Sequence, residues 1–262
     1  MQADVRRARL LELVRSRGFA SLPDLASELE VSESTVRRDL DSLEDLGSAK
    51  RTHGGVFYTG PTPNLPHFEL RQEMQWEKKR QIARAASALI EDGDTVLLDG
   101  GSTTYELAQL LVGRTLQVVT NSLPVANLFM ASSTTDLIFV GGYVHNRTGV
   151  SVGQYATETI AKLNARRAVL STAGVTEQGL YNSNLLLVET EQAMVRAAGE
   201  VIIVADSTKF GRQSLAHQCP LDEIDRLVVD DQITPRWLKV LQDAGIDPIV
   251  ADSAPPPETA AR

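Results

Sequence analysis

The sequence is nearly free of cysteine, and it contains no long apolar run. Its single cysteine, Cys219, excludes an intrachain disulfide and is typical of a reducing compartment. No stretch approaches the roughly 20 apolar residues that a membrane-spanning helix needs. The N-terminal segment 1–9 carries too many charges for a signal peptide. We therefore expect a soluble cytoplasmic protein without a membrane partner.

The chain also lacks a net positive charge and the common nucleotide-binding motifs. Because the formal charge is −8, any contact with nucleic acid must come from local arginines and lysines. Neither a Gly-x-Gly-x-x-Gly motif nor a P-loop Gly-Lys-Ser/Thr is present, so nothing indicates a dinucleotide. The four histidines are scattered, and the pair His217 and Cys219 has no second pair to complete a zinc site. We expect neither a cofactor nor a metal.

The segment from Ser32 to Gly47 predicts a helix with one apolar face and one polar face. Ser32 is a favourable N-cap, and Gly47 ends the helix. Apolar residues recur at helical spacing, at Val36, Leu40, Leu43 and Leu46. The polar face begins with Ser34, Thr35, Arg37 and Arg38. Short hydroxyls and arginines read base edges and phosphates in a major groove, although a surface helix with a charged face is the alternative.

Two shorter helices are predicted before this segment and a hairpin after it. Asp4 begins the first, which runs to about residue 17 with Val5, Leu10 and Val14 inward, and Ser21 begins the second. A tight turn then leads into the third helix, which completes a helix-turn-helix. Residues 48–58 predict a wing, whose alternative is a solvated hairpin. Three wing residues are candidates for phosphate or minor-groove contacts: Lys50, Arg51 and His53.

The string Ser-Thr-Val-Arg-Arg-Asp-Leu at 34–40, followed by the Gly-Gly wing, resembles the winged helix-turn-helix of the DeoR family of bacterial repressors. The resemblance extends to about residue 250. It implies that Thr35, Arg37 and Arg38 contact double-stranded operator DNA and that the chain represses a sugar-catabolic operon. Because two recognition helices bind two half-sites, we expect a homo-oligomer, a dimer or a tetramer.

The proline-rich segment 59–66 marks a boundary between two domains. Three prolines and a glycine in eight residues exclude a helix or a central strand there. We therefore predict a DNA-binding domain at 1–58, a linker at 59–75 and a second domain at 76–253. The tail 254–262, which contains three consecutive prolines, is expected to be disordered.

The second domain alternates short apolar runs with helical segments. The apolar runs lie at 95–99, 116–120, 137–140, 168–171, 201–205 and 227–229. Such runs are typical of buried parallel strands, and the helical segments between them supply the crossovers. The expected fold class is therefore α/β, with a doubly wound sheet after the winged helix-turn-helix.

Polar residues follow four of these runs, at the edge where open α/β sheets bind ligands. They are Asp99, Gly100, Gly101, Ser102, Thr103, Thr104, Thr120, Asn121, Ser122, Gly141, Gly142, Asp206 and Lys209. The glycines let the backbone approach a ligand closely, and hydroxyls at a helix start can hold a phosphate. Lys209 would supply a cation, and Asp99 and Asp206 would accept hydrogen bonds from sugar hydroxyls. Any one of these strand ends could also be an ordinary turn.

The same motifs resemble the sensor domain of DeoR-type repressors. The resemblance implies a fold related to ribose-phosphate isomerases and a phosphorylated sugar as effector, whose binding relieves repression. The segment 187–194 departs from many family members, which carry a Glu and a Lys-Arg pair there, and it is closer to the ascorbate-operon repressors of the family.

Two other functions account for part of the sequence. A sugar-phosphate isomerase with Asp99 or Glu189 as its base would explain residues 94–210 and nothing of residues 1–58. A structural DNA-binding protein without a ligand would explain the reverse. We therefore expect a regulator and not an enzyme.

Overall fold

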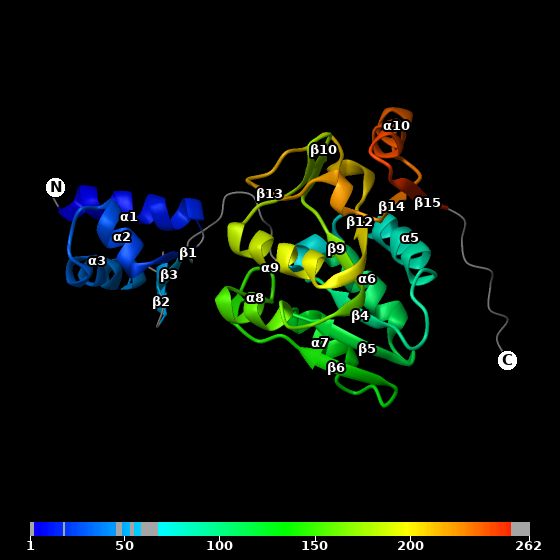
Figure 1. Ribbon diagram of the computed structural model, residues 1–262, viewed down its shortest axis with the longest axis horizontal. Helices are drawn as coiled ribbons and strands as arrows, with labels where there is room; N and C mark the ends of the chain where they lie inside the picture. The colour runs from blue at the N-terminus through cyan, green and yellow to red at the C-terminus, as the bar shows by residue number, and fades with distance from the viewer. Residues whose placement is uncertain (1–2, 18, 46–48, 53–54, 59–67, 253–262) are drawn as a thin grey trace. The chain divides into compact units, whose positions relative to one another are not determined.

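The computed structural model describes residues 3–17, 19–45, 49–52, 55–58 and 68–252 (Figure 1). The chain divides into two compact units, mainly between Leu65 and Pro66, and each is described by itself. Most of the expected linker and the whole tail 254–262 lie outside the described residues. The domain limits at residues 58 and 75 therefore stay predictions.

The N-terminal unit is a winged helix-turn-helix. Its elements in chain order are α1 (Ala3–Arg17), β1 (Phe19–Ser21), α2 (Leu22–Glu28), α3 (Glu33–Asp45), β2 (Ala49–Thr52) and β3 (Gly55–Tyr58). Strand β3 pairs antiparallel with both β2 and β1. The expected wing is confirmed, and a third short strand, β1, extends it.

One small core holds the helices and the wing together. Its fully buried side chains include Leu10, Val14, Leu25, Val36, Leu40 and Val56. The expectation for Val5 was wrong, because its side chain is 58% exposed. At about 100° per residue, Val5 lies roughly 140° around α1 from Leu10 and so on a different face. Helix α1 begins at Ala3, one residue before the expected cap Asp4.

The C-terminal unit is a doubly wound α/β domain, as the alternation of strands and helices predicted. Its main sheet has seven strands in the order β15-β14-β12-β9-β4-β5-β6, and all neighbours are parallel. The strands are β4 (Thr95–Leu98), β5 (Leu116–Thr120), β6 (Thr135–Phe139), β9 (Ala165–Ser171), β12 (Ala198–Val204), β14 (Arg226–Asp230) and β15 (Asp247–Ala251). The last of these was not foreseen.

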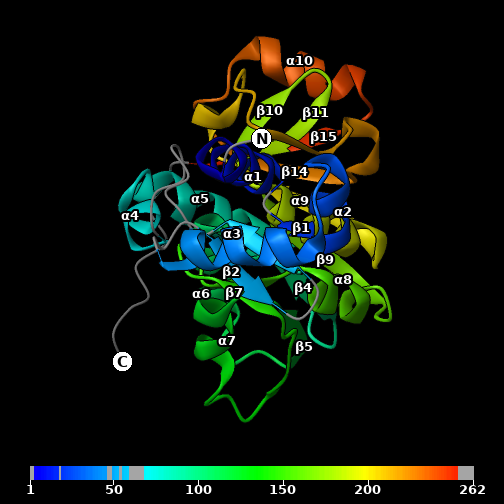
Figure 2. The same cartoon turned by 90° about the vertical axis from the view of Figure 1, so that its left-hand side faces the viewer.

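Helices cover both faces of this sheet. One apolar core lies under α5 (Trp76–Ser87), α6 (Ser102–Leu111) and α7 (Leu123–Phe129). A second core lies under α8 (Gln154–Ile160), α9 (Leu185–Arg196) and α10 (Pro235–Asp243). Figure 2 shows α5, α6 and α7 on one side of the strands, with α8 and α9 on the other. The sheet is therefore buried on both faces, which explains its continuous apolar runs.

Short elements that the sequence did not reveal complete the C-terminal unit. They are the helix α4 (Phe68–Glu73), the hairpin β7 (Tyr143–His145) and β8 (Val150–Val152), the turn η1 (Ser207–Lys209) with η2 (Leu221–Glu223), and an antiparallel sheet of β10 (Gly174–Thr176), β11 (Gly179–Asn182) and β13 (Ala216–Cys219). Strands of three or four residues are too short to show a period. None of the described helices is long and apolar enough to cross a lipid bilayer.

Candidate functional site

Helix α3 begins at a hydroxyl cluster that the sequence predicts. The Ser32 Oγ accepts a hydrogen bond from the Thr35 backbone N at 3.3 Å, as an N-cap does. The same oxygen lies 2.8 Å from the Ser34 Oγ and 2.9 Å from the Thr35 Oγ1. Val36 and Leu40 are fully buried on the opposite face. The helix is thus fixed by its apolar face and its cap, and its polar face is left outward.

The outward face of α3 carries two arginines, of which one is ion-paired within the helix and the other is not. Arg37 is ion-paired with Glu33, one turn earlier, at 3.3 Å. The Arg38 guanidinium is exposed, and no side chain among the described residues pairs with it. Ser34 is exposed and Thr35 is half-buried. Arg38 is therefore available to a phosphate or a base without breaking an internal contact.

The remaining DNA-contact candidates are in the wing. Lys50 and Arg51 are in strand β2, with Lys50 opposite Phe57 and Arg51 opposite Val56. His53 lies outside the described residues.

Asp39 was not singled out from the sequence, and it joins α3 to α1. Its carboxylate accepts a hydrogen bond from the Arg6 Nε at 2.5 Å, and the Arg7 Nε lies 3.8 Å away. Asp39 is 5% exposed, so this pair is largely removed from water. It fixes the orientation of the recognition helix within its own unit.

Asp99, at the end of β4, already has hydrogen-bond donors within the protein. Its Oδ1 accepts from the Gly101 N at 2.9 Å, and its Oδ2 accepts from the Ser171 N at 2.8 Å and the Ser171 Oγ at 2.9 Å. The carboxylate therefore joins β4 to β9. Only the lone pairs that these three bonds leave free can accept hydrogen bonds from sugar hydroxyls, the role expected for Asp99.

The two glycines after Asp99 are required by packing within the protein. A Cβ at Gly100 would lie 1.9 Å from the Val150 Cγ1, and one at Gly101 would lie 1.9 Å from the Ser171 Oγ. The atoms that an added Cβ would meet belong to side chains of other elements. The expectation that these glycines let the backbone approach a ligand stays a prediction.

The first turn of α6 and the end of β5 carry side-chain hydroxyls. Some of them form hydrogen bonds within the protein, and one has no partner. Ser102, Thr103 and Thr104 are buried in the first turn of α6, which no side chain caps, and the Thr104 Oγ1 has no partner. The Thr120 Oγ1 donates to the Leu98 carbonyl, and Ser122 caps α7 through the Val125 N. These two hydroxyls are therefore occupied.

Strand β8 runs along three of the four expected strand ends. Val150 lies against Gly100 and Ser122, and Val152 lies against Gly142. The Asn121 Nδ2 donates to the Ser151 carbonyl at 2.8 Å, while its Oδ1 has no partner. Gly141 is exposed, and a Cβ there would meet nothing within 4 Å. The structure therefore brings these ends together through an element that the sequence did not reveal.

The fourth strand end carries a capping carboxylate and a free lysine. Asp206 is 1% exposed and accepts a hydrogen bond from the Thr208 N at 3.0 Å, at the start of η1. The half-buried Lys209 ammonium has neither a hydrogen bond nor an ion pair with any described residue. The Lys78 ammonium also lies at this strand end, but it is paired with Asp230 at 3.3 Å. Lys209 is thus the free cation of this strand end.

Sequence reasoning assigned no role to three further residues at this edge. Arg71 in α4 packs its guanidinium 5.5 Å from the centre of the Phe68 ring. Lys79 in α5 donates to the Arg71 and Met74 carbonyls. Glu191 in α9 accepts a hydrogen bond from the Asn182 Nδ2 at 2.6 Å. These residues come from helices far from the strand ends in sequence, so no local pattern indicated them.

Electrostatic interactions connect these residues to one another. Burial raises the pKa of Glu191 well above its usual range, the Asp99 carboxylate raises it further, and Asn182 and Arg71 act in the opposite direction. Burial also lowers the pKa of Arg71, against the attraction of Asp99 and Glu191. Burial lowers the pKa of Lys79 to about 8, with Asp206 raising it and Lys209 and Arg71 lowering it. Glu191, Arg71 and Lys79 therefore interact electrostatically with the charged groups around them.

Several polar atoms at this edge are buried without any hydrogen-bond partner. They are the Arg71 Nε and Nη2, the Thr104 Oγ1, the Asn121 Oδ1, the Ser151 Oγ, the Ser183 Oγ, the Glu191 Oε2 and the Gln218 Oε1. In native structures such groups are rare, and each requires an explanation, such as a bound water, an ion or a ligand. We name this set the unpartnered cluster.

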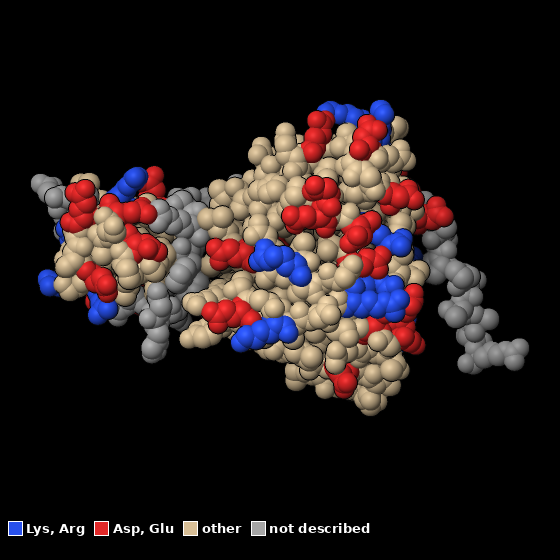
Figure 3. Space-filling model, in the orientation of Figure 1, with Lys and Arg blue, Asp and Glu red and all other residues tan. Residues whose placement is uncertain are grey.

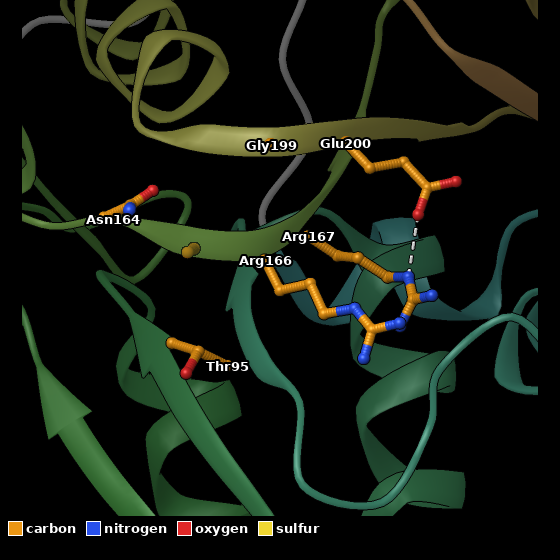
Figure 4. Close-up of a pocket in the computed structure, with 7 residues that line it drawn as sticks. Thr95, Asn164, Arg166, Arg167, Gly199 and Glu200 are labelled. Atoms are coloured by element: carbon orange, nitrogen blue, oxygen red, sulfur yellow. Dashed lines mark hydrogen bonds and ion pairs between the residues drawn. The ribbon is translucent and has the colours of Figure 1, made fainter.

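A shallow hollow lies at the opposite, amino edge of the sheet (Figure 4). Thr95, Asn164, Arg166, Arg167, Gly199 and Glu200 line it. Its cations are already neutralised, because Arg167 pairs with Asp94 and with Glu200, and Arg166 pairs with Asp94 at 2.8 Å. Among the described residues, no three His, Cys, Asp or Glu side chains gather as a metal site requires.

Two family models match the chain. Residues 6–62 match the DeoR-like helix-turn-helix domain, and residues 74–231 match the DeoR C terminal sensor domain. The HTH-type transcriptional regulator UlaR of Shigella dysenteriae serotype 1 (strain Sd197) is 29% identical over 238 residues, which are 90% of this chain and 94% of that protein. UlaR of Escherichia coli (strain K12 / DH10B) is 28% identical over 239 residues, with the same coverage.

Similar solved structures include two kinds of protein. Ribose 5-phosphate isomerase A from Methanocaldococcus jannaschii has a TM-score of 0.37 and 18% identity, and the match covers 50% of this chain and 53%, about half, of the isomerase. The eIF2B beta chain from Chaetomium thermophilum has a TM-score of 0.41 and 15% identity, with 83% of this chain and 62% of that chain covered.

Proposed function

Because the chain belongs to the DeoR family of DNA-binding transcriptional regulators, we propose that it represses a sugar-catabolic operon and leaves its operator when a phosphorylated sugar binds the C-terminal unit. The unpartnered cluster supports the effector part of this proposal. Buried polar atoms without partners are costly, and a ligand that supplies the partners offsets that cost.

We place the phosphate of the effector at the first turn of α6, with Lys209 as its cation. The backbone N–H groups of an uncapped helix start carry a partial positive charge and bind anions. Lys79 links the two parts of this site, because its ammonium is within electrostatic reach of Glu106 on α6 and of Lys209. Lys209 then forms the charge-assisted contact that no protein side chain provides.

DNA binding follows from the outward face of α3. Ser34, Thr35, Arg37 and Arg38 enter the major groove, and the wing residues Lys50, Arg51 and His53 contact the backbone or the minor groove. Two copies bind two half-sites, so the active form is a homo-oligomer, a dimer or a tetramer. The effector changes operator affinity only as far as it binds the DNA-bound and free states differently.

A sugar-phosphate isomerase is not favoured. Three hydrogen bonds already engage Asp99, and Glu189, the other expected base, is exposed. The relatives are named as transcriptional regulators.

A thermal-shift screen of phosphorylated sugars, followed by operator gel shifts, tests the proposal. A ligand that binds only the folded chain must raise the melting temperature, and it should release operator DNA at the same concentrations. Lys209→Met should weaken ligand binding by roughly 1.5–3 kcal/mol, the usual range for a charged hydrogen bond. The matched control is Lys239→Met, since Lys239 is paired with Asp243 on α10.

Three results would contradict the proposal. They are a screen without any stabilising phosphorylated sugar, a stabilising sugar that leaves operator binding unchanged, or a Lys209→Met variant that responds as the wild type does.

A further inference from the structure

Strand β6 is one of the two outer strands of the seven-stranded sheet. It pairs with β5 on one side, and no described strand pairs with it on the other. Val140, directly after β6, donates its N–H to the Thr120 carbonyl at 2.8 Å. Because consecutive residues of a strand direct their backbone groups to opposite sides, the N–H and C=O groups of Leu137 and Phe139 point away from β5. No described residue forms a hydrogen bond with these groups.

The other outer strand, β15, is protected against pairing with a further strand. It contains Pro248, which has no N–H to donate, and it begins with the charged Asp247. Proline and charged side chains commonly block the edge strands of natural sheets. Strand β6 has no proline, and its one charged residue is Asp136. Of the two edges of this sheet, β6 is therefore the one suited to accept a further strand.

The surface around β6 is apolar and nearly free of charge. Residues 115–146 contain one Lys, Arg, Asp or Glu, although these types make up 23% of the chain. In Figure 3 the lowest part of the C-terminal unit, where Figure 1 places α7 and β6, is almost entirely uncharged. Four large apolar side chains are exposed there, on β6 and on α7, which packs against it: Leu123, Met130, Ile138 and Phe139. We name these four the uncharged edge, because depletion of charge together with exposed Met and Phe is typical of the centre of a protein interface.

We propose that the uncharged edge binds the same edge of a second copy of this chain, with the two β6 strands antiparallel about a two-fold axis. Leu137 and Phe139 each offer a donor and an acceptor, so the contact is self-complementary. A charged partner would lose hydration here without gaining an opposite charge. An axis beside Leu137 or Ile138 also keeps the two Asp136 carboxylates from lying opposite each other. The inference rests on the proposed homo-oligomer and names the surface that forms it.

The mass of the full chain in solution, measured by light scattering after size exclusion, tests the inference. Ile138→Lys and Met130→Lys each place a charge in the contact, and both side chains are exposed, at 36% and 73%, so the fold should tolerate the change. Val250→Lys is the matched control, since Val250 is a 42% exposed apolar residue on the other outer strand, β15. At one protein concentration, we expect both β6-side variants to have half the wild-type mass and Val250→Lys to keep it. Circular dichroism reports the fold of each variant.

Cysteine substitution locates the two-fold axis. Residues directly opposite in an antiparallel pair have Cβ atoms about 4.5–5.5 Å apart, within reach of a short thiol cross-linker. Leu137→Cys or Ile138→Cys should therefore be converted to a covalent dimer, because one of these two residues lies beside the axis. Val250→Cys should remain uncross-linked. The native Cys219 is buried, so the wild-type chain serves as the blank.

The outcomes separate this inference from the proposed function. If the wild type is an oligomer and neither lysine variant at the uncharged edge lowers its mass, the surface is wrong and the homo-oligomer stands. If the wild type is a monomer, both are wrong, and the edge is left to a different protein. A halved mass in Val250→Lys as well would overturn the assignment to β6. The absence of a covalent dimer in both Leu137→Cys and Ile138→Cys would overturn the strand pairing.

Discussion

At the scale of single residues, removal of the Arg38 side chain from α3 should weaken DNA binding and leave the fold intact. It is exposed and has no partner among the described side chains. Arg38→Ala should weaken operator binding by about 1–3 kcal/mol, the range for one good base contact, or roughly 5- to 150-fold. Gel shifts at one fixed salt concentration measure it, because phosphate contacts depend on salt.

Arg236→Ala is the matched control for Arg38, since it removes an exposed arginine that pairs with Glu177 at 3.0 Å in the C-terminal unit. Circular dichroism should show an intact fold in both variants. Unchanged operator affinity in Arg38→Ala would mean that α3 does not read this DNA through Arg38.

His145 should make the stability of the C-terminal unit sensitive to acid. Burial, with the nearby Arg147 and Arg71 charges, lowers the pKa of His145 from 6.5 to about 4. Between those two values the unfolded chain binds more protons than the folded one, so the free energy of unfolding must fall as pH falls from 6.5 to 4. Thermal unfolding across this range should show a steeper loss in the wild type than in His145→Gln. Equal slopes would mean that His145 is solvated.

At the scale of elements, the sequence predicted what lies within one helix or one strand. The apolar face of α3 and its Ser32 cap, and the buried runs of the parallel sheet, follow from periods that a few neighbouring residues reveal. Helix α4 and strands β7 and β8 are too short to show a period. The sequence therefore gave no signal for Arg71 and Ser151, although both belong to the unpartnered cluster.

The glycines after β4 have a packing role that the sequence did not reveal, because the side chains next to them lie far away in the sequence. Gly101 is required, but the atom that would meet a Cβ is the Ser171 Oγ at 1.9 Å. Gly101→Ala should therefore destabilise the C-terminal unit by about 1–3 kcal/mol, as overpacking does. Gly141→Ala is the control, because a Cβ there meets nothing within 4 Å. Chemical denaturation compares the two, and an equally stable Gly101→Ala would disprove the packing argument.

At the scale of the whole molecule, charge and assembly act together. The chain carries −8, and the face of the C-terminal unit in Figure 3 shows basic side chains interspersed with acidic ones. A general basic field therefore cannot supply the affinity for DNA, which must come from local contacts. In the proposed oligomer, each copy repeats these contacts. The assembly could not be read from periodicity, because it depends on contacts between distant surfaces.

A DNA duplex with two half-sites should bind far more tightly than one with a single half-site. The second contact in an oligomer is effectively intramolecular, so the gain should be 10²-fold or more. Centre-to-centre spacing should matter, with about 10–10.5 base pairs or multiples favoured. Gel shifts of duplexes with altered spacing, with light scattering for the assembly, measure both effects. Equal binding to single and double half-sites would indicate that a monomer is the active form.

The unpartnered cluster has a kinetic consequence. The Arg71 Nε, the Asn121 Oδ1 and the Glu191 Oε2 are closed to water, and a group closed to water is closed to a ligand as well. On the proposed function, the edge opens before the effector enters, and we expect that opening, not diffusion, to limit the rate of induction. In stopped-flow mixing, the observed rate should level off at a plateau as effector concentration rises. A rate that instead climbs in proportion to concentration would show that the site is open beforehand.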